Sequence, residues 1–245
     1  MDSIQYLLSM ETRGIKLGIQ RTREMMAACD NPHSGLPVIQ VAGTNGKGSV
    51  SAIISNILIN AGYKTGLFTS PHLVRVNERI RINGASIADN EIDLFIKLYK
   101  TDIEKNEATF FETITAIAFW YFKKEGVEIA IMETGLGGRL DSVSICEPIA
   151  TIITPISHDH MEILGETLAE IAFEKAGAMK KNVVCISAKQ DSAATKVLSK
   201  QADIMGTPIH FLNGVSIPDY DINIPGETQR ENALLAILAL SHING

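Results

Sequence analysis

The chain has 245 residues, of which 45% are hydrophobic and 20% charged, and its formal net charge at pH 7 is -6. This length and hydrophobic content are sufficient for the core of one large domain. The acidic balance provides no basic field for nucleic acid or for an anionic membrane, although an anionic small ligand could still bind in a local cationic pocket. We therefore expect a compact soluble protein without nucleic-acid or membrane partners.

Cysteine usage and the first residues both favour a reducing cytoplasm. Cys29, Cys146 and Cys185 are far apart and form no C-x-x-C pair, so neither a disulfide framework nor a zinc site is predicted. The first residues show no basic segment followed by a long apolar one, and polar residues interrupt the longer apolar stretches. No signal peptide and no membrane span are predicted.

Short β-branched runs alternate with longer helical patterns along the chain. The strand candidates are mostly apolar throughout, as expected for strands covered on both faces, and Gly62, Gly126 and Gly206 can each end a helix. This order predicts an α/β fold with a doubly wound, mostly parallel sheet that binds ligands at the carboxyl ends of its strands. In chain order the expected elements are strand Val38–Val41, helix Val50–Ala61, strand Thr65–Phe68, helices Glu91–Glu104 and Phe110–Glu125, strands Ile129–Met132 and Ala150–Thr154, helix Leu168–Ala176, strand Val183–Ser187, helix Ala193–Ile204, strand Ile209–Leu212 and helix Gln229–His242.

The first strand runs into "GTNGKGS", which precedes an amphipathic helix. In this arrangement backbone N–H groups can surround a polyphosphate, Lys47 supplies the compensating charge, and Ser49 is placed to meet Mg²⁺. The spacing departs from the usual P-loop, because Gly43 and Gly46 are three apart and Gly48 separates Lys47 from Ser49. A turn that merely links strand and helix is the alternative, but the coincidence of lysine, hydroxyl and helix favours phosphate binding. The G-x-G-x-x-G dinucleotide fingerprint does not occur at this turn.

Two later strand ends carry side chains suited to metal or phosphate chemistry. "IAIMETGLGGRLD" runs a strand into Glu133, where a P-loop protein commonly carries the acid that holds Mg²⁺; a glutamate that simply ends a strand is the alternative. "TPISHDHMEILG" carries His158, Asp159 and His160. Histidine is an unusual Mg²⁺ ligand, so this motif is either a site or a polar loop. Lys175, taken alone, has the pattern of an ordinary surface lysine.

The motifs occur in the order found in the folylpolyglutamate synthase/dihydrofolate synthase family of the ATP-dependent Mur ligase superfamily. The chain resembles this family from about Gly14 to Ala236. The superfamily shares the phosphate loop, whereas "SPHL…ERIRING" and "FFE" resemble the folate branch. The motifs are "GIKLG", "VAGTNGKGS", "TSPHL" with "NERIRING", "FFETITAIAF", "METGLGGRLD", "HDHMEILGETLAEIAFEKAG" and "PGETQRENALLA".

The resemblance implies an ATP site, a magnesium site and a modified lysine. Lys175 matches a lysine that the family carbamylates, which makes chemical sense because CO₂ turns a cation into a carboxylate that can approach metal ions. Lys47, Lys175 and His160 form the expected catalytic set. The expected nucleotide-binding residues are Thr44, Asn45, Gly46, Lys47, Gly48, Ser49 and, near the adenine, Asn232; the expected magnesium ligands are Ser70, Glu133 and His160.

The resemblance also implies a folate site and marks one departure from the family. The helical spacing of the aromatic and aliphatic side chains around Phe110 is equally that of a core face, so a packing role is the alternative for them. The family's usual histidine before Gln229 is Thr228 here. The residues that resemble the pteroate-binding segment are Phe110, Phe111, Glu112, Leu140 and Asp141.

By this resemblance, ATP phosphorylates the carboxylate of dihydropteroate or of a reduced folate, and the amine of L-glutamate then attacks the acyl phosphate. The sequence does not distinguish the two acids. The family continues with a second α/β domain after "ENALLA", so residues 1–245 are expected to be the ATP-binding domain alone, in a monomeric enzyme.

Two other function classes remain open. One is a nucleotide-binding module that acts through a partner without ligase chemistry. The other is a P-loop GTPase, which the absence of N-K-x-D disfavours. Retention of Lys47, Glu133, His160 and Lys175 together favours the enzyme, because a decayed site would be expected to lose at least one of these charged or polar groups.

Overall fold

An eight-stranded sheet forms the centre of the structure, a computed structural model that describes residues 2–212 and 226–243. The strand order is β4-β3-β2-β5-β1-β6-β7-β8, and neighbouring strands from β2 to β8 are parallel. β3 and β4 add an antiparallel edge. The strands are β1 Val38–Ala42, β2 Thr65–Phe68, β3 Ile80–Ile82, β4 Ala85–Ser86, β5 Ile129–Glu133, β6 Ala150–Ile153, β7 Val184–Ser187 and β8 Ile209–Phe211.

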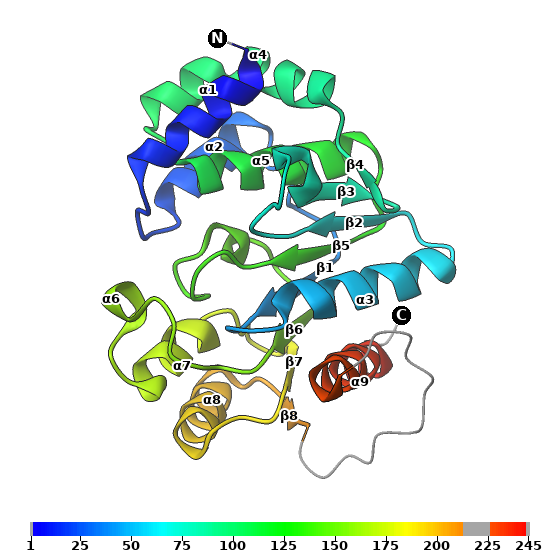
Figure 1. The fold of residues 1–245 in the computed structure, drawn as a ribbon, viewed down its shortest axis with the longest axis vertical. Helices are drawn as coiled ribbons and strands as arrows, with labels where there is room; N and C mark the ends of the chain where they lie inside the picture. The colour runs from blue at the N-terminus through cyan, green and yellow to red at the C-terminus, as the bar shows by residue number, and fades with distance from the viewer. Residues whose placement is uncertain (1, 213–225, 244–245) are drawn as a thin grey trace.

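Helices cover both faces of this sheet (Figure 1). α3 and α9 pack on one face, whereas α5, surrounded by α1, α2 and α4, and the pair α7 and α8 cover the other. The predicted α/β fold with a doubly wound, mostly parallel sheet is confirmed. The helices are α1 Ser3–Ser9, α2 Gln20–Ala28, α3 Lys47–Asn60, α4 Asp89–Lys105, α5 Phe110–Lys124, α6 Met161–Leu164, α7 Leu168–Ala176, α8 Ser192–Met205 and α9 Glu227–Ser241, and the 3₁₀ helices are η1 Met10–Arg13, η2 Val76–Arg79 and η3 Ser142–Ile145.

β1 shows why the central strands are apolar throughout. Successive side chains of a strand point to opposite faces. Val38 packs in the α5 layer, whereas Ile39 and Val41 pack against α3 and α9. All of β1 is buried, so both faces of the strand must be compatible with a dry core, apart from Gln40, which donates to the Ser144 hydroxyl at 2.6 Å.

The observed elements differ from the predicted ones in two informative places. α3 begins at Lys47, three residues earlier than expected, because Gly46 adopts a left-handed cap conformation and the lysine already lies in the first turn. The β3–β4 hairpin was not predicted. Its turn is Asn83–Gly84, both at positive φ, and Asn-Gly is the pair that favours such two-residue hairpin turns.

Within residues 2–212 and 226–243, no helix combines the length and apolar character that crossing a membrane requires. The three cysteines are buried and carry no disulfide.

Candidate active site

The segment Gly43–Ser49, called the glycine loop below, joins β1 to α3 and offers backbone donors at its end. Among the described residues, the amides of Gly46, Lys47, Gly48 and Ser49 have no hydrogen-bond acceptor, and no side chain caps the helix. Unpaired N–H groups at a helix start, together with the helix dipole, attract anions. This end of the 14-residue helix α3 is therefore suited to bind a phosphate group.

Close packing explains two of the glycines in this loop. A Cβ on Gly43 would lie 2.0 Å from the Thr154 hydroxyl oxygen, and a Cβ on Gly46 would lie 2.6 Å from Oδ1 of Asn232. Both glycines also have positive φ, +134° and +87°. Asn232, on α9, is only 2% exposed, so the structure brings this predicted nucleotide-binding residue directly against the loop.

Two lysines contact the glycine loop from different elements. Lys47 is partly exposed, and its Nζ donates to the Thr44 carbonyl at 3.1 Å. Lys175, on α7, is 3% exposed and donates to the Gly43 carbonyl at 2.6 Å. Burial, and next the charge of Lys47, lower the pKa of Lys175 to about 8. About a tenth of the Lys175 side chains are therefore neutral amines at pH 7, far more than for an ordinary surface lysine.

Glu133 ends β5 beside the same loop. Its side chain is 2% exposed, and Oε2 accepts the Ser70 amide at 3.2 Å and lies 3.6 Å from where a Cβ on Gly48 would be. Burial raises the pKa of Glu133 to about 7, although the Lys47 charge opposes this shift. The carboxylate thus gains a strong preference for a cationic partner, such as a divalent metal ion.

Replacing Glu133 with glutamine should remove a pH-dependent loss of stability. The pKa of Glu133 is about 7 in the folded state, above the ordinary value of 4.5. The contribution of the protonated Glu133 to the free energy of unfolding is therefore full below pH 4.5 and is lost as the pH rises through 7. The free energy of unfolding lost in this way is about 3 kcal/mol, at 1.36 kcal/mol per pKa unit. Urea unfolding of both proteins at pH 5 and pH 8 measures it, and the exposed Glu162→Gln serves as the control. Equal pH dependence in wild type and Glu133→Gln would contradict this reading of the buried carboxylate.

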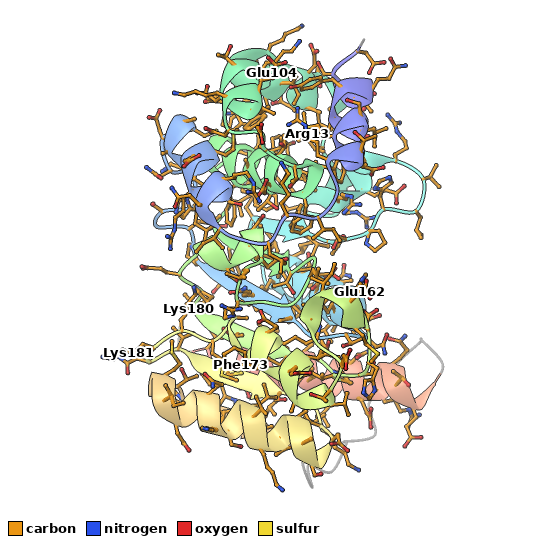
Figure 2. All side chains as sticks on the ribbon, turned by 90° about the vertical axis from the view of Figure 1, so that its left-hand side faces the viewer. Arg13, Glu104, Glu162, Phe173, Lys180 and Lys181 are labelled. Atoms are coloured by element: carbon orange, nitrogen blue, oxygen red, sulfur yellow. The ribbon has the colours of Figure 1, made fainter. Side chains whose placement is uncertain are left out.

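His160 lies between β6 and α6 in the chain. It has left-handed backbone angles and precedes the short helix α6, which Figure 2 shows, marked by Glu162, beside α7, marked by Phe173. The His160 ring is about half exposed and lies 3.7 Å from both Asp159 and Glu162. The described residues contain no cluster of three or more histidine, cysteine or acidic side chains that could hold a metal ion. A magnesium site here would therefore need oxygen ligands from a nucleotide or water besides protein groups.

A cavity of about 340 Å³ joins several of the predicted site residues. It brings the predicted magnesium ligands Ser70 and His160 together with four of the five residues predicted for the folate site. Phe110 is not at its wall: this ring is buried in the core, with the Arg79 guanidinium 5.0 Å from its centre. The cavity is lined by Gly14, Ile15, Lys16, Leu17, Ser70, Pro71, Arg79, Thr109, Phe111, Glu112, Gly135, Leu136, Leu140, Asp141, Ser142 and His160.

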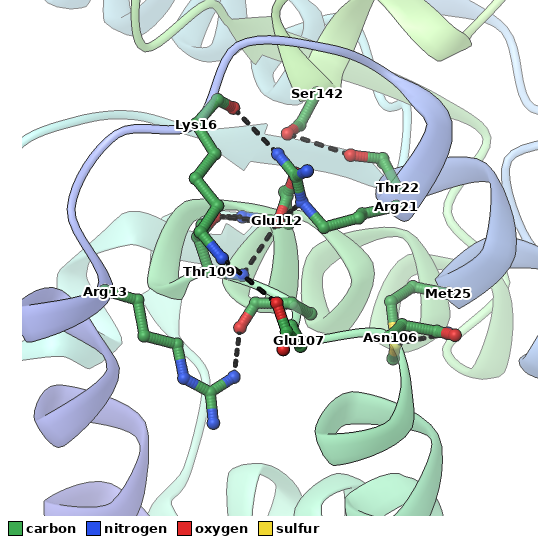
Figure 3. A network of polar contacts seen from close by, with 11 residues as sticks. Arg13, Lys16, Arg21, Thr22, Met25, Asn106, Glu107, Thr109, Glu112 and Ser142 are labelled. Atoms are coloured by element: carbon green, nitrogen blue, oxygen red, sulfur yellow. Dashed lines mark hydrogen bonds and ion pairs between the residues drawn. The ribbon is translucent and has the colours of Figure 1, made fainter.

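The two acids in the cavity wall already have structural partners. Glu112 accepts the Thr109 amide at 2.7 Å, which completes a capping box at the start of α5, and pairs with Arg21 at 2.9 Å (Figure 3). Asp141 accepts three backbone amides, those of Gly135, Leu136 and Val143, each at 2.9 Å. Burial raises the pKa of Asp141 to about 6. Both carboxylates shape the cavity, and their contact with a ligand stays a prediction.

The cavity also has a wall that sequence reasoning missed. The segment Gly14–Leu17 precedes α2, and Figure 3 shows how it is held: Arg21 donates to the Lys16 carbonyl at 3.0 Å, and Lys16 pairs with Glu107 at 3.4 Å. "GIKLG" contributed to the family resemblance, but nothing in its composition indicates that it lies over α5.

Arg79 is a second part of the cavity wall that sequence analysis did not predict. It is buried, lines the cavity and donates from Nε to Nδ1 of His72 at 2.9 Å. Burial lowers its pKa, while Glu11 and Glu133 oppose that shift. No local pattern distinguishes Arg79 from Arg81 two residues later, because only the tertiary position buries one of them more deeply.

Comparison with known sequences places this arrangement in a class of proteins. The Mur ligase middle domain family matches residues 41–240, and the chain belongs to that family. Dihydrofolate synthase/folylpolyglutamate synthase of Bacillus subtilis (strain 168) is 38% identical over 260 residues, which cover 94% of this chain and 60% of that protein. Folylpolyglutamate synthase of Arabidopsis thaliana is 35% identical over 256 residues, which cover 97% of this chain and 41% of that protein. The resemblance predicted from the motifs is confirmed.

Solved structures agree with this assignment. An FPGS–AMPPCP complex superposes with a TM-score of 0.90 at 27% identity, over 98% of this chain and 66% of that one. Folylpolyglutamate synthase from Thermotoga maritima gives a TM-score of 0.86 at 30% identity, over 98% of this chain and 61% of that one. The chain thus spans less than two thirds of the length of each of these four relatives.

Proposed function

We propose that residues 1–245 are the ATP-binding domain of an acid–amino-acid ligase of the folylpolyglutamate synthase/dihydrofolate synthase type. The observation that carries this proposal is the glycine loop: unpaired amides at the start of α3 lie with Lys47, Lys175 and the buried Glu133 carboxylate around this one segment. The relatives named as synthases of this kind support it, as do solved FPGS complexes with AMPPCP and with folate.

The glycine loop would bind the phosphates of ATP. The amides of Gly46 to Ser49 donate to phosphate oxygens, and Lys47 exchanges its contact with the Thr44 carbonyl for the stronger attraction of the phosphate charge. Thr44 and Asn45 shape the start of the loop, and Asn232 orients the nucleotide near the adenine. Lys47 and the amides then stabilise the charge that spreads over the transferred phosphoryl group.

The donor atoms beside the loop suit magnesium. The Glu133 carboxylate and the Ser70 hydroxyl are oxygen donors of the kind that Mg²⁺ prefers, and His160, which lines the same cavity as Ser70, would complete the set. When bound with ATP, Mg²⁺ neutralises phosphate charge. Glu133 must lose its proton to take part, which its pKa of about 7 permits near neutral pH.

Lys175 would act as a carbamate. Its neutral amine attacks CO₂, a C–N bond forms, and the proton leaves to solvent, so that a buried cation becomes an anion beside the magnesium site. The lowered pKa favours this step, because only the unprotonated amine is nucleophilic.

The cavity would take the acid that is activated, either dihydropteroate or a reduced folate. Phe111 and Leu140 provide an apolar surface for an aromatic group. The acid's carboxylate would face the glycine loop. One carboxylate oxygen attacks the γ-phosphorus of ATP, the bond to the ADP oxygen breaks, and an acyl phosphate forms. The amine of L-glutamate then attacks the acyl carbon, phosphate leaves, and the amide remains.

We further propose that the protein acts as a monomer in the cytoplasm. The three unpaired cysteines, all buried, are compatible with a reducing compartment. Sedimentation of the purified protein measures the oligomeric state, and a stable dimer would contradict this part of the proposal.

Isotope transfer tests the reaction itself. The full-length protein is incubated with ATP, glutamate and dihydropteroate that carries ¹⁸O in its carboxylate, and a parallel reaction uses tetrahydrofolate. We expect one ¹⁸O atom in the released phosphate, because the acid's oxygen bridges to phosphorus in the acyl phosphate. Amide formation with unlabelled phosphate would exclude this mechanism, and absence of ATP binding would exclude the proposed function.

Replacing Lys175 with alanine should reduce ligase turnover roughly 10- to 100-fold, the usual loss when a group that supports a metal site is removed. With ¹³C-bicarbonate, the wild type should give a carbamate carbon signal by NMR that the variant lacks. Lys181→Ala, at an exposed position, is the control. Full turnover in Lys175→Ala, with no carbamate signal in the wild type, would remove this lysine from the site.

A further inference from the structure

We propose that Gln190 is a positioning residue for ATP binding, although it lies outside the glycine loop. Its side-chain amide hydrogen-bonds to the turn Thr154–Ser157, which follows β6. This turn hydrogen-bonds to the first residues of the glycine loop. This inference rests on the proposed binding of ATP phosphates at Gly46 to Ser49.

The side chain of Gln190 hydrogen-bonds to both a backbone donor and a backbone acceptor of the turn. Its Oε1 accepts the Ile156 amide at 2.9 Å, and its Nε2 donates to the Thr154 carbonyl at 3.1 Å and to the Ser187 hydroxyl at 3.1 Å. A flipped amide would set donor against donor and acceptor against acceptor, so these contacts define its orientation. Gln190 follows β7, and the bridge therefore links the loops after two neighbouring strands.

The turn contacts the first two residues after Gly43. The Pro155 carbonyl accepts the amides of Thr44 at 3.0 Å and Asn45 at 3.3 Å. The Ser157 amide donates to the Thr44 hydroxyl at 3.2 Å, and the Asn45 side-chain amide donates to the Ser157 hydroxyl at 3.1 Å.

These contacts divide the amides of the glycine loop into two groups. Thr44 and Asn45 are used by the turn, and the next four amides are left without acceptors in the described part of the chain. The direction of the second group depends on the first, because the two groups are consecutive along the backbone. Without the Gln190 bridge, the turn loses its support from β7, and the unpaired amides lose the common orientation that a phosphate group requires.

The test is the equilibrium affinity of Gln190→Ala for Mg·AMPPCP, measured by calorimetry. We expect Kd to rise roughly tenfold, as the loss of one or two hydrogen bonds to the turn predicts. Hydrogen exchange at the amides of Thr44 and Asn45 should also become faster. The matched control is Asp191→Ala, the next residue, which caps α8 through the Ala193 amide at 2.7 Å. Asp191→Ala should lower stability and leave both Kd and these two exchange rates unchanged.

A second variant separates positioning from general packing. Gln190→Glu keeps an acceptor for the Ile156 amide but cannot donate to the Thr154 carbonyl, so we expect a raised Kd in this variant as well, even if Gln190→Ala does not fold. Wild-type Kd and exchange rates in a folded Gln190 variant would overturn the inference. If that happens while Lys47→Ala abolishes binding, only the role of Gln190 fails; if wild-type protein binds no nucleotide at all, the proposed function fails with it.

Discussion

Replacing Lys47 with alanine should lower ATP-dependent turnover by roughly 100- to 1,000-fold while leaving the fold intact. This is the usual effect of removing one preorganised group that stabilises charge in the transition state. The fold should survive because Lys47 is partly exposed and, among the described residues, donates only to the Thr44 carbonyl of its own loop. Calorimetry with Mg·ATP and product formation measure the loss, and thermal unfolding checks the fold.

Lys97→Ala is the control for this prediction. Lys97 is also helical, but it pairs with Asp93 one turn away at the surface, so its loss should change neither binding nor turnover. Near-normal turnover of the Lys47 variant would mean that the glycine loop is not where phosphate is transferred.

Replacing Gly43 with alanine should abolish nucleotide binding for a steric reason. The new Cβ would lie 2.0 Å from the Thr154 hydroxyl oxygen and 2.9 Å from the Thr154 backbone nitrogen, so the loop or the strand end must move. Thr154 is fully buried and Gly43 is buried near the centre of the sheet, where little space exists to relax. We expect the free energy of unfolding to fall by about 2–4 kcal/mol, the sum of overpacking and positive φ.

Gly62→Ala provides the matched control, because Gly62 also has positive φ, +95°, but a Cβ there meets nothing within 4 Å. It isolates the backbone effect of about 1 kcal/mol from the clash. Urea unfolding and calorimetry compare the two variants. Equal stability losses and equal Mg·ATP affinities in both would show that Thr154 does not constrain the loop.

Much of this site could be predicted from sequence, because parallel strands bring their carboxyl ends to one edge of a sheet. The glycine loop after β1 and Glu133 after β5 are about 90 residues apart in the chain, yet β1 and β5 pair directly, with Val41 opposite Glu133. The expectation that these residues lie at one edge does not require knowledge of the strand order. It requires only that each polar residue comes directly after an apolar run.

The sequence could not predict which of two adjacent residues on one helix faces the cavity. Phe110 and Phe111 share the helical pattern of a core face, but only Phe111 lines the cavity, whereas Phe110 packs into the core under Arg79. The orientation of α5 relative to the sheet decides which ring faces the cavity. A local signal was available for Glu112, since Thr109 and Glu112 have the spacing of a capping box.

The burial of particular charged residues also could not be predicted from the sequence. Lys175 has the sequence context of a surface lysine, but α7 packs so that its ammonium reaches the Gly43 carbonyl, 132 residues earlier in the chain. Lys175, Arg79 and the segment Gly14–Leu17 acquire their positions from tertiary contacts, which no pattern in their own neighbourhood reports.

A crystal structure with Mg·AMPPCP tests the central claim most directly. We predict that the β- and γ-phosphates lie within hydrogen-bond distance of the amides of Gly46 to Ser49, with the Lys47 ammonium moved from the Thr44 carbonyl to a phosphate oxygen. Binding of the nucleotide elsewhere, or a glycine loop without phosphate at a saturating concentration of Mg·AMPPCP, would contradict the account.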